Sequence, residues 1–272
     1  MAAGPAFPVT VAFVNGDLTL RGPRRAGRWL VCATVVALCA SAGCFKTRYL
    51  AQAARGQLAL KCAAEPLDAV IADPKTPDRV KALLREVPAI KSFGEAHGLT
   101  ATKNYRAYAD VGRSSTAWAV TACAPLRFEE KLWRFPIVGS VPYLGFFHEK
   151  TAREYAKALE RDGLDVDVRG VSTYSTLGWF RDPITSPMLA DGPNALGDLV
   201  DVVLHESVHA TIYLDDQTPF NESLASFVAP RLAADYLART RGSDAPETIV
   251  FADERLRIAH VDSSLYSAWG EL

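Results

Sequence analysis

Two histidines and a glutamate stand at a spacing that suits metal chemistry. His205, Glu206 and His209 occur in the order H-E-x-x-H. Residues four apart lie on one face of a helix, so both imidazoles can reach a single metal ion. Glu206 lies about 100° around the helix from His205. From that position its carboxylate can act as a general base on a water molecule at the metal.

The residues on either side of this pattern are apolar. Five apolar residues lie between Leu199 and Leu204, and Ala210, Ile212 and Leu214 follow the second histidine. This composition predicts a buried helix whose polar residues gather on one side, whereas the alternative is a surface helix with scattered polar side chains. Unpaired polar groups are costly to bury, which favours a metal ion as their partner.

A third ligand is expected close by, because a catalytic zinc site uses three protein ligands and keeps one open position. The stretch 215–219 predicts a turn that ends the first helix, with Thr218 as the N-cap of a second helix and Pro219 as its first residue. Glu222 then lies early in a helix that folds back on the first, and its carboxylate can complete a His/His/Glu set. Asp215 and Asp216 are competitors for this position, although a turn is their more natural role.

The residues HESVH followed by FNESLASF resemble the gluzincin metallopeptidases, in which an N-E pair on the next helix supplies the third zinc ligand. The resemblance is closer to one group, the predicted zinc aminopeptidases of bacteria. Three further stretches resemble that group: Tyr49–Leu58, Phe135–Phe147 and Thr173–Pro183. Together the similar stretches run from residue 44 nearly to residue 230. The resemblance implies Zn²⁺ as the cofactor and a peptide as the substrate.

A sheet edge in gluzincins lies beside the cleft and pairs with the substrate backbone. Thr173–Trp179 is the best candidate for this edge. Gly178 would allow a close approach of the substrate backbone. Tyr174 and Trp179 are candidates for lining the substrate pocket, and the alternative for both is ordinary aromatic packing.

Three tyrosines compete for the role of hydrogen-bond donor to an oxyanion. Tyr174 is the first candidate, and Tyr213 and Tyr236 are its rivals. Tyr213 follows His209 by about one helical turn, so its ring can instead support the ligand helix.

The N-terminal region has the parts of a secretory signal. Residues 1–28 contain four arginines, and the uncharged apolar run Trp29–Ala42 is too short for a comfortable membrane span. The run ends in Ser-Ala-Gly-Cys, which resembles a bacterial lipobox. We therefore expect cleavage before Cys44 and lipid attached to it, which tethers the protein to a membrane. The alternative is an uncleaved N-terminal anchor.

This assignment divides the chain into residues 1–43, an N-terminal extension with a lipoprotein-type signal, and residues 44–272, a peptidase domain. The expected location is the periplasmic side of the bacterial cell envelope. Cys62 and Cys123 remain in the mature chain, where an oxidising compartment permits a disulfide. Two buried thiols are the favoured alternative.

The predicted elements give an α+β fold. It is zincin-like and mostly helical, with a small sheet beside the two metal-ligand helices. The net charge of −1 gives no basic excess that would indicate nucleic acid as a partner. Further helices are expected at Leu50–Cys62, Arg79–Ala96, Glu149–Asp162, Arg231–Arg241 and Asp253–His260, and extended segments at Ala107–Asp110, Ser115–Cys123, Trp133–Tyr143 and Val166–Val171.

The expected function is that of a membrane-tethered zinc peptidase, and an aminopeptidase in particular. His205, His209 and Glu222 are its expected ligands and Glu206 its general base. One rival is a lipid-anchored binding or assembly protein that keeps the metal only for structure, since a fold does not guarantee its usual chemistry. A second rival is a sensor that titrates another protein and cleaves peptides only weakly.

Overall fold

The computed structural model describes residues 9–10, 45–127, 129–135, 139–175 and 181–271. The chain divides into two compact units. The first contains Met1–Val11, Ala63–Ala117 and Gly170–Leu272, and the second contains Ala12–Cys62 and Trp118–Arg169. Each unit is described by itself. The expected domain boundary at residues 43 and 44 falls outside the described residues.

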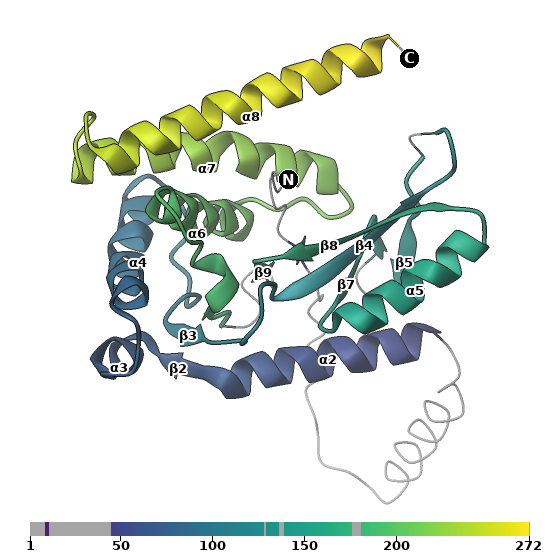
Figure 1. Ribbon diagram of the computed structural model, residues 1–272, viewed down its shortest axis with the longest axis horizontal. Helices are drawn as coiled ribbons and strands as arrows, with labels where there is room; N and C mark the ends of the chain where they lie inside the picture. Colours follow the sequence, from purple (N-terminus) through teal and green to yellow (C-terminus); the bar gives the residue numbers. More distant parts are fainter. Residues whose placement is uncertain (1–8, 11–44, 128, 136–138, 176–180, 272) are drawn as a thin grey trace, which may run out of the picture. The chain divides into compact units, whose positions relative to one another are not determined.

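The first unit is built mainly from helices: α3 (Leu67–Ala72), α4 (Asp78–Ala96), α6 (Ala195–Thr211), α7 (Thr218–Thr240) and α8 (Pro246–Gly270). Helix α6 packs against α4, α7 and α8, and Figure 1 shows α7 between α6 and α8. The core contains side chains from all five helices, among them Leu84, Leu204, Leu237 and Phe251. The buried helix predicted around residue 205 is therefore at the centre of this unit.

Short strands complete the first unit. Strand β3 (Ala107–Ala109) pairs with β2 (Ala64–Pro66) in antiparallel and with β10 (Ile184–Thr185) in parallel orientation. The short 3-10 helix η1 (Ser186–Met188) follows β10. Strand β9 (Tyr174–Ser175) pairs in parallel with β1 (Val9–Thr10). Because β3 and β10 run parallel to each other, both strands begin at the same end of the three-stranded sheet.

The second unit contains the helices α2 (Phe45–Ala63) and α5 (Glu149–Arg161) and, among its described residues, two small sheets. Strand β4 (Ala117–Cys123) lies between β7 (Leu144–Phe146) and β8 (Asp165–Val171), and β5 (Trp133–Phe135) pairs with β6 (Gly139–Val141).

Aromatic residues dominate the core of the second unit. The Tyr49 ring packs 5.5 Å from both the Phe135 and the Phe146 rings, and its hydroxyl accepts the Gly145 N–H at 3.2 Å. Two of the stretches that carry the family resemblance, around residues 49 and 135–147, therefore form this core.

The mixed α+β class is confirmed, with small sheets and a mainly helical chain. Two expectations about burial are wrong. Cys62 and Cys123 are free, and Cys62 is exposed because it lies on the outer side of the last turn of α2. Ile212 and Leu214 are 48% and 47% exposed, because α6 ends at Thr211 and leaves them in the following loop.

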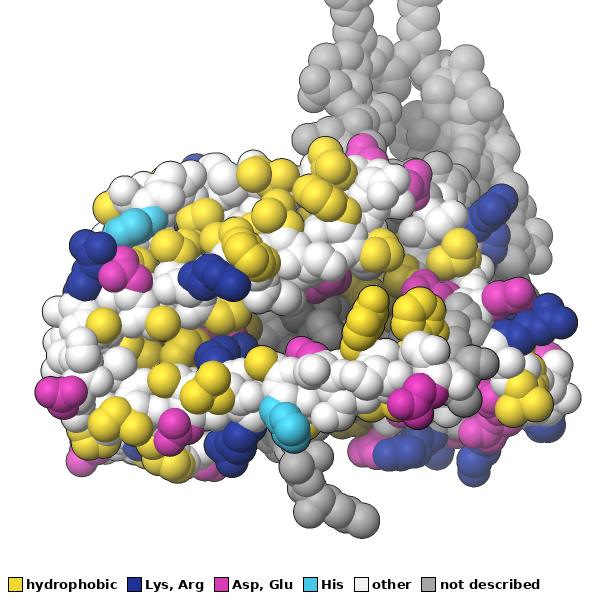
Figure 2. Space-filling model, turned by 90° about the horizontal axis from the view of Figure 1, so that it is seen from above, with side chains coloured by type: hydrophobic (Ala, Val, Ile, Leu, Met, Phe, Trp, Pro, Cys, Tyr) yellow, Lys and Arg dark blue, Asp and Glu magenta, His cyan; other side chains and the backbone are white. Residues whose placement is uncertain are grey.

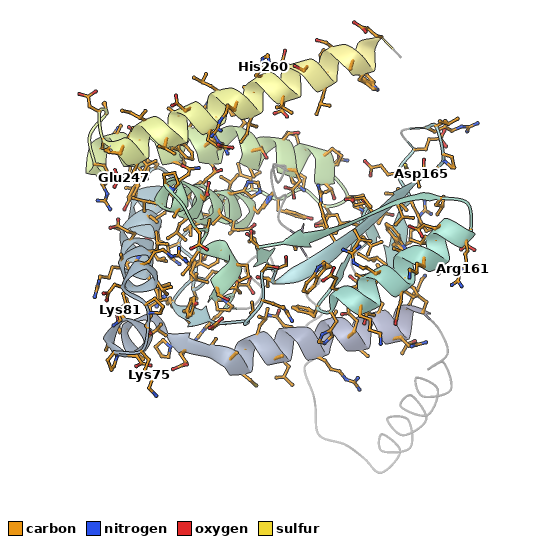
Figure 3. All side chains as sticks on the ribbon, in the orientation of Figure 1. Lys75, Lys81, Arg161, Asp165, Glu247 and His260 are labelled. Atoms are coloured by element: carbon orange, nitrogen blue, oxygen red, sulfur yellow. The ribbon has the colours of Figure 1, made fainter. Side chains whose placement is uncertain are left out.

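Exposed hydrophobic side chains lie on α7 and α8, including Phe227 at 57% and Leu256 at 70% exposure. Figure 2 shows hydrophobic side chains interspersed with charged ones on the face viewed from above. His260, labelled in Figure 3, is exposed on α8. Among the described residues, no helix is both long enough and apolar enough to cross a membrane.

Candidate metal centre

Helix α6 carries the two histidines and the glutamate of the motif into the interior. His205, Glu206 and His209 are 9%, 2% and 2% exposed. The helix ends two residues after His209, where the Ile212 N–H donates to the Val208 carbonyl at 2.9 Å. The apolar residues before His205 pack into the core, so the motif is held on a rigid and buried element.

Glu222 comes from the first turns of α7, after a loop that reverses the chain. Asn221 fixes this loop, because its Oδ1 accepts the Leu214 N–H at 2.9 Å and its Nδ2 donates to the Leu214 carbonyl at 2.8 Å. Asn221 is itself 1% exposed. It therefore positions the backbone next to Glu222. The N-cap of α7 is Gln217 rather than Thr218, because the helix starts one residue earlier than expected.

The three predicted ligands meet at their metal-binding atoms. His205 Nε2 lies 3.1 Å from His209 Nε2 and 3.4 Å from Glu222 Oε2, and His209 Nε2 lies 3.5 Å from Glu222 Oε1. Bonds of about 2.0–2.2 Å in a tetrahedral zinc site place ligand atoms roughly 3.3 Å apart. The triangle therefore has the dimensions of three corners of such a site. Two imidazoles and a carboxylate are also a common donor set of catalytic zinc, so the cluster can hold a metal ion.

Charge links the cluster. Burial lowers the pKa of His205, but contact with Glu222 and the charges of Glu206, Glu222 and Asp201 outweigh burial and raise it. Burial raises the pKa of Glu222, whereas contacts with the two histidines lower it to about 2. Glu222 is therefore ionised near neutral pH, which is the form that binds a cation.

Tyr105 is a neighbour of Glu206 that sequence reasoning missed. Its side chain is 2% exposed, and its hydroxyl has no hydrogen-bond partner among the described residues. Burial raises its pKa well above the ordinary value, and the charges of Glu206 and Asp182 add to this effect. Its φ of +61° is a left-handed conformation that is unusual for a tyrosine. Nothing in the sequence spacing marks this residue, because only the folded chain brings it towards α6.

Of the rival ligands and oxyanion donors, Asp215, Asp216 and Tyr236 do not join the cluster, whereas Tyr213 lies beside it. Asp215 and Asp216 are exposed in the loop before α7, and the metal-binding cluster of the described residues does not include them. The Tyr236 hydroxyl donates to Glu86 at 3.0 Å, so this rival donor already has a partner on α4. The Tyr213 ring lies 6.3 Å from the His209 ring at an interplanar angle of 75°, which agrees with a role in packing beside the ligand.

The expected substrate edge is only partly described. Tyr174 lies in the two-residue strand β9, which pairs with β1. Gly178 and Trp179 lie outside the described residues, as does Cys44. Their expected roles stay predictions.

Comparison with known proteins gives one match. The family model described as "Putative aminopeptidase" matches residues 48–263. This region includes the whole metal-binding cluster and most of both units. No curated protein and no solved structure matches the chain.

Proposed function

The chain belongs to the putative aminopeptidase family, and on this premise we propose that it is a zinc-dependent aminopeptidase whose metal is held by His205, His209 and Glu222. The observation that carries the proposal is the triangle of Nε2, Nε2 and carboxylate atoms with sides of 3.1, 3.4 and 3.5 Å. A metallopeptidase uses such a site because an amide bond is a poor electrophile that a metal ion can activate.

Zinc held by these residues would supply Lewis-acid chemistry, which activates a carbonyl group and acidifies water. Glu206 is next to a ligand on the same helix and is buried with it. Its carboxylate takes a proton from water and gives it to the leaving amine nitrogen. Asn221 holds the loop that precedes Glu222, so the ligand geometry depends on a side chain that does not bind the metal.

The proposal extends to the place of the enzyme in the cell. Basic residues, a short apolar run and Ser-Ala-Gly-Cys precede the region that matches the family. We propose that lipid on Cys44 anchors the enzyme on the periplasmic side of the bacterial envelope, where it would act on peptides.

Substitution of Glu206 by Gln tests the catalytic role. The amide keeps the shape of the side chain but removes the base, and Glu206 is not a proposed ligand. General-base catalysis is worth about 10²–10⁴-fold, so turnover of a susceptible peptide should fall at least about a hundredfold. Zinc content measured by mass spectrometry should not change.

Glu160→Gln, an exposed glutamate on α5, is the matched control and should keep the full rate. A Glu206→Gln protein that keeps both its zinc and its rate would remove Glu206 from the mechanism. Wild-type protein that binds zinc but hydrolyses nothing in a broad peptide library would favour a binding protein on the same scaffold.

A further inference from the structure

A second feature of the first unit is a cavity of about 330 Å³ beside the three-stranded sheet. It is lined by Lys103, Arg106, Arg181 and Asp182, together with small apolar residues of β2 and β3. We call these four residues and the space between them the cationic pocket. Its volume is at the lower end of the range found for small-molecule sites.

Positive charge exceeds negative charge in the cationic pocket. Three of its side chains are cations and one is a carboxylate. Among the described residues, the side chains of Lys103, Arg106 and Arg181 form no ion pair or hydrogen bond. The positive charge of Arg106 also acts on the neighbouring Lys91. Burial lowers the pKa of Lys91, and repulsion from Arg106 lowers it further. The positive charge of the pocket is thus left for an anion.

Hydrogen bonds fasten together the two segments that carry these cations. Asn104 Oδ1 accepts the Asp182 N–H at 3.2 Å, and the Tyr105 N–H donates to the Asp182 carbonyl at 2.7 Å. The Lys91 ammonium also donates to the carbonyls of Thr102 and Asn104. The bonds to Asp182 hold the segment before β3 against the segment before β10, and the Lys91 bonds hold it against α4, so the backbone that carries the three exposed cations is fixed.

Tyr105 connects the cationic pocket with Glu206 on helix α6. Asp182 lines the pocket and holds the backbone of Tyr105, while the buried Tyr105 side chain is close enough to Glu206 for the two to interact electrostatically. Tyr105 is therefore linked to the pocket through its backbone and to the proposed general base through the charge effect on its side chain.

We propose that the cationic pocket binds a carboxylate of the peptide substrate, so that the enzyme prefers peptides that carry one. This inference rests on the proposed peptidase function. The carboxylate belongs either to the C-terminus of a short peptide or to an acidic side chain. An Arg guanidinium recognises both through the same paired hydrogen bonds. Two arginines and a lysine around one cavity suit this group better than a neutral amide.

Calorimetric binding of peptides to the metal-free full chain tests the proposal without hydrolysis. Trialanine should bind about tenfold more tightly than its C-terminal amide if the terminal carboxylate is recognised. If an acidic side chain is recognised, the amide of Ala-Ala-Glu should instead bind about tenfold more tightly than the amide of trialanine. Equal binding of all three peptides, or binding of none, would overturn the proposal.

Variants of the pocket locate the effect. Arg106→Gln and Arg181→Gln should each reduce the preference for a carboxylate severalfold. Arg85→Gln, an exposed arginine on α4 that does not line the pocket, should leave it unchanged. A preference that survives both pocket substitutions would assign the carboxylate to another site. Because the binding comparison needs neither zinc nor turnover, its failure is separate from a failure of the Glu206→Gln test.

Discussion

Glu222 differs from the two histidines in how it reaches the cluster, and this makes it the most informative of the proposed ligands. His205 and His209 share a face of one helix, whereas Glu222 depends on the loop between α6 and α7. Loss of its carboxylate would leave two ligands, which is fewer than a catalytic zinc site uses.

We predict that Glu222→Ala weakens zinc binding at least about a hundredfold, beyond the effect typical of residues that only support a ligand. Metal content of the purified variant and competition with a chelator measure this. Asp216→Ala, in the adjacent loop, should keep its zinc. Stoichiometric zinc in Glu222→Ala would move the third ligand to Asp215 or Asp216.

Asp198 is a half-buried acid on α6, where burial disfavours its charged form. Burial raises its pKa from 3.8 to about 6, Arg255 lowers it, and Asp201 and Glu254 raise it. A folded-state pKa above the unfolded one means that the folded protein binds more protons between about pH 4 and pH 6. Stability therefore falls as pH rises through this window, and the penalty is complete above it.

We predict that Asp198→Asn stabilises the fold at pH 8 by about 1 kcal/mol. This is well below the ceiling that the full shift implies, because water screens a partly exposed group. Near pH 4 the variant and the wild type should be about equally stable. Urea unfolding at the two pH values measures the difference, and a variant that is less stable at pH 8 would show that the Asn194 contact to Asp198 outweighs desolvation.

The sequence could predict some of these residues and not others. The spacing of His205, Glu206 and His209 is a local pattern. The position of Glu222 could be predicted because the next residues indicate a turn followed by a second helix. Tyr105 and the residues of the cationic pocket lack such a signal, because they come together through strand pairing between segments that are far apart in the chain. Asn221 belongs to the N-E pair, but its hydrogen bonds to Leu214 depend on the shape of the loop.

At the scale of elements, the position of α6 depends on close contacts with its neighbours. A Cβ added at Gly197 would lie 2.5 Å from Cδ2 of the buried Phe251 on α8 and 2.6 Å from Asn194 Oδ1. A Cβ at Gly94 on α4 would lie 2.9 Å from Leu204 Cδ2. Glycine at these positions lets α4 and α8 approach the helix that carries the motif.

We predict that Gly197→Ala destabilises the protein by about 1 kcal/mol. Overpacking against Phe251 costs about 1–3 kcal/mol, and the better helix propensity of alanine returns about 1 kcal/mol. In a Phe251→Leu background the same substitution should cost less, because the ring that opposes the new methyl group is gone and only the contact with Asn194 remains. Urea unfolding of the four proteins measures the coupling, and a stabilising effect in the wild-type background would contradict the contact.

Long helices were predicted more completely than short elements, although α8 covers Pro246–Gly270 where only Asp253–His260 was expected. The expected helix Arg79–Ala96 corresponds to α4 within one residue at its start, because apolar residues recur along it at helical spacing. Helix α3 and the strands β2 and β10 have six, three and two residues, too few to show a period. Both strands are defined by their pairing with β3, and the sequence alone does not show this pairing because it joins segments that are far apart in the chain.

At the scale of the whole molecule, the metal centre and the cationic pocket both lie in the first unit, which is assembled from separate stretches of the chain. The family match starts at residue 48, four residues after Cys44. The proposed membrane anchor and the family region are thus adjacent in sequence, and the two can be tested separately.

We predict that Cys44→Ser releases the protein from membranes or leaves its precursor uncut, while zinc content is retained. The thiol of Cys44 is the proposed attachment point for lipid, and stable anchoring takes more than one acyl chain, so loss of this residue removes the anchor as a whole. Fractionation of cells, followed by mass measurement of the N-terminus, reads out both effects. Cys62→Ser, which changes an exposed cysteine of α2, is the matched control and should stay at the membrane. If Cys44→Ser protein is processed and fractionates as the wild type does, the N-terminal segment anchors or targets the chain by another route.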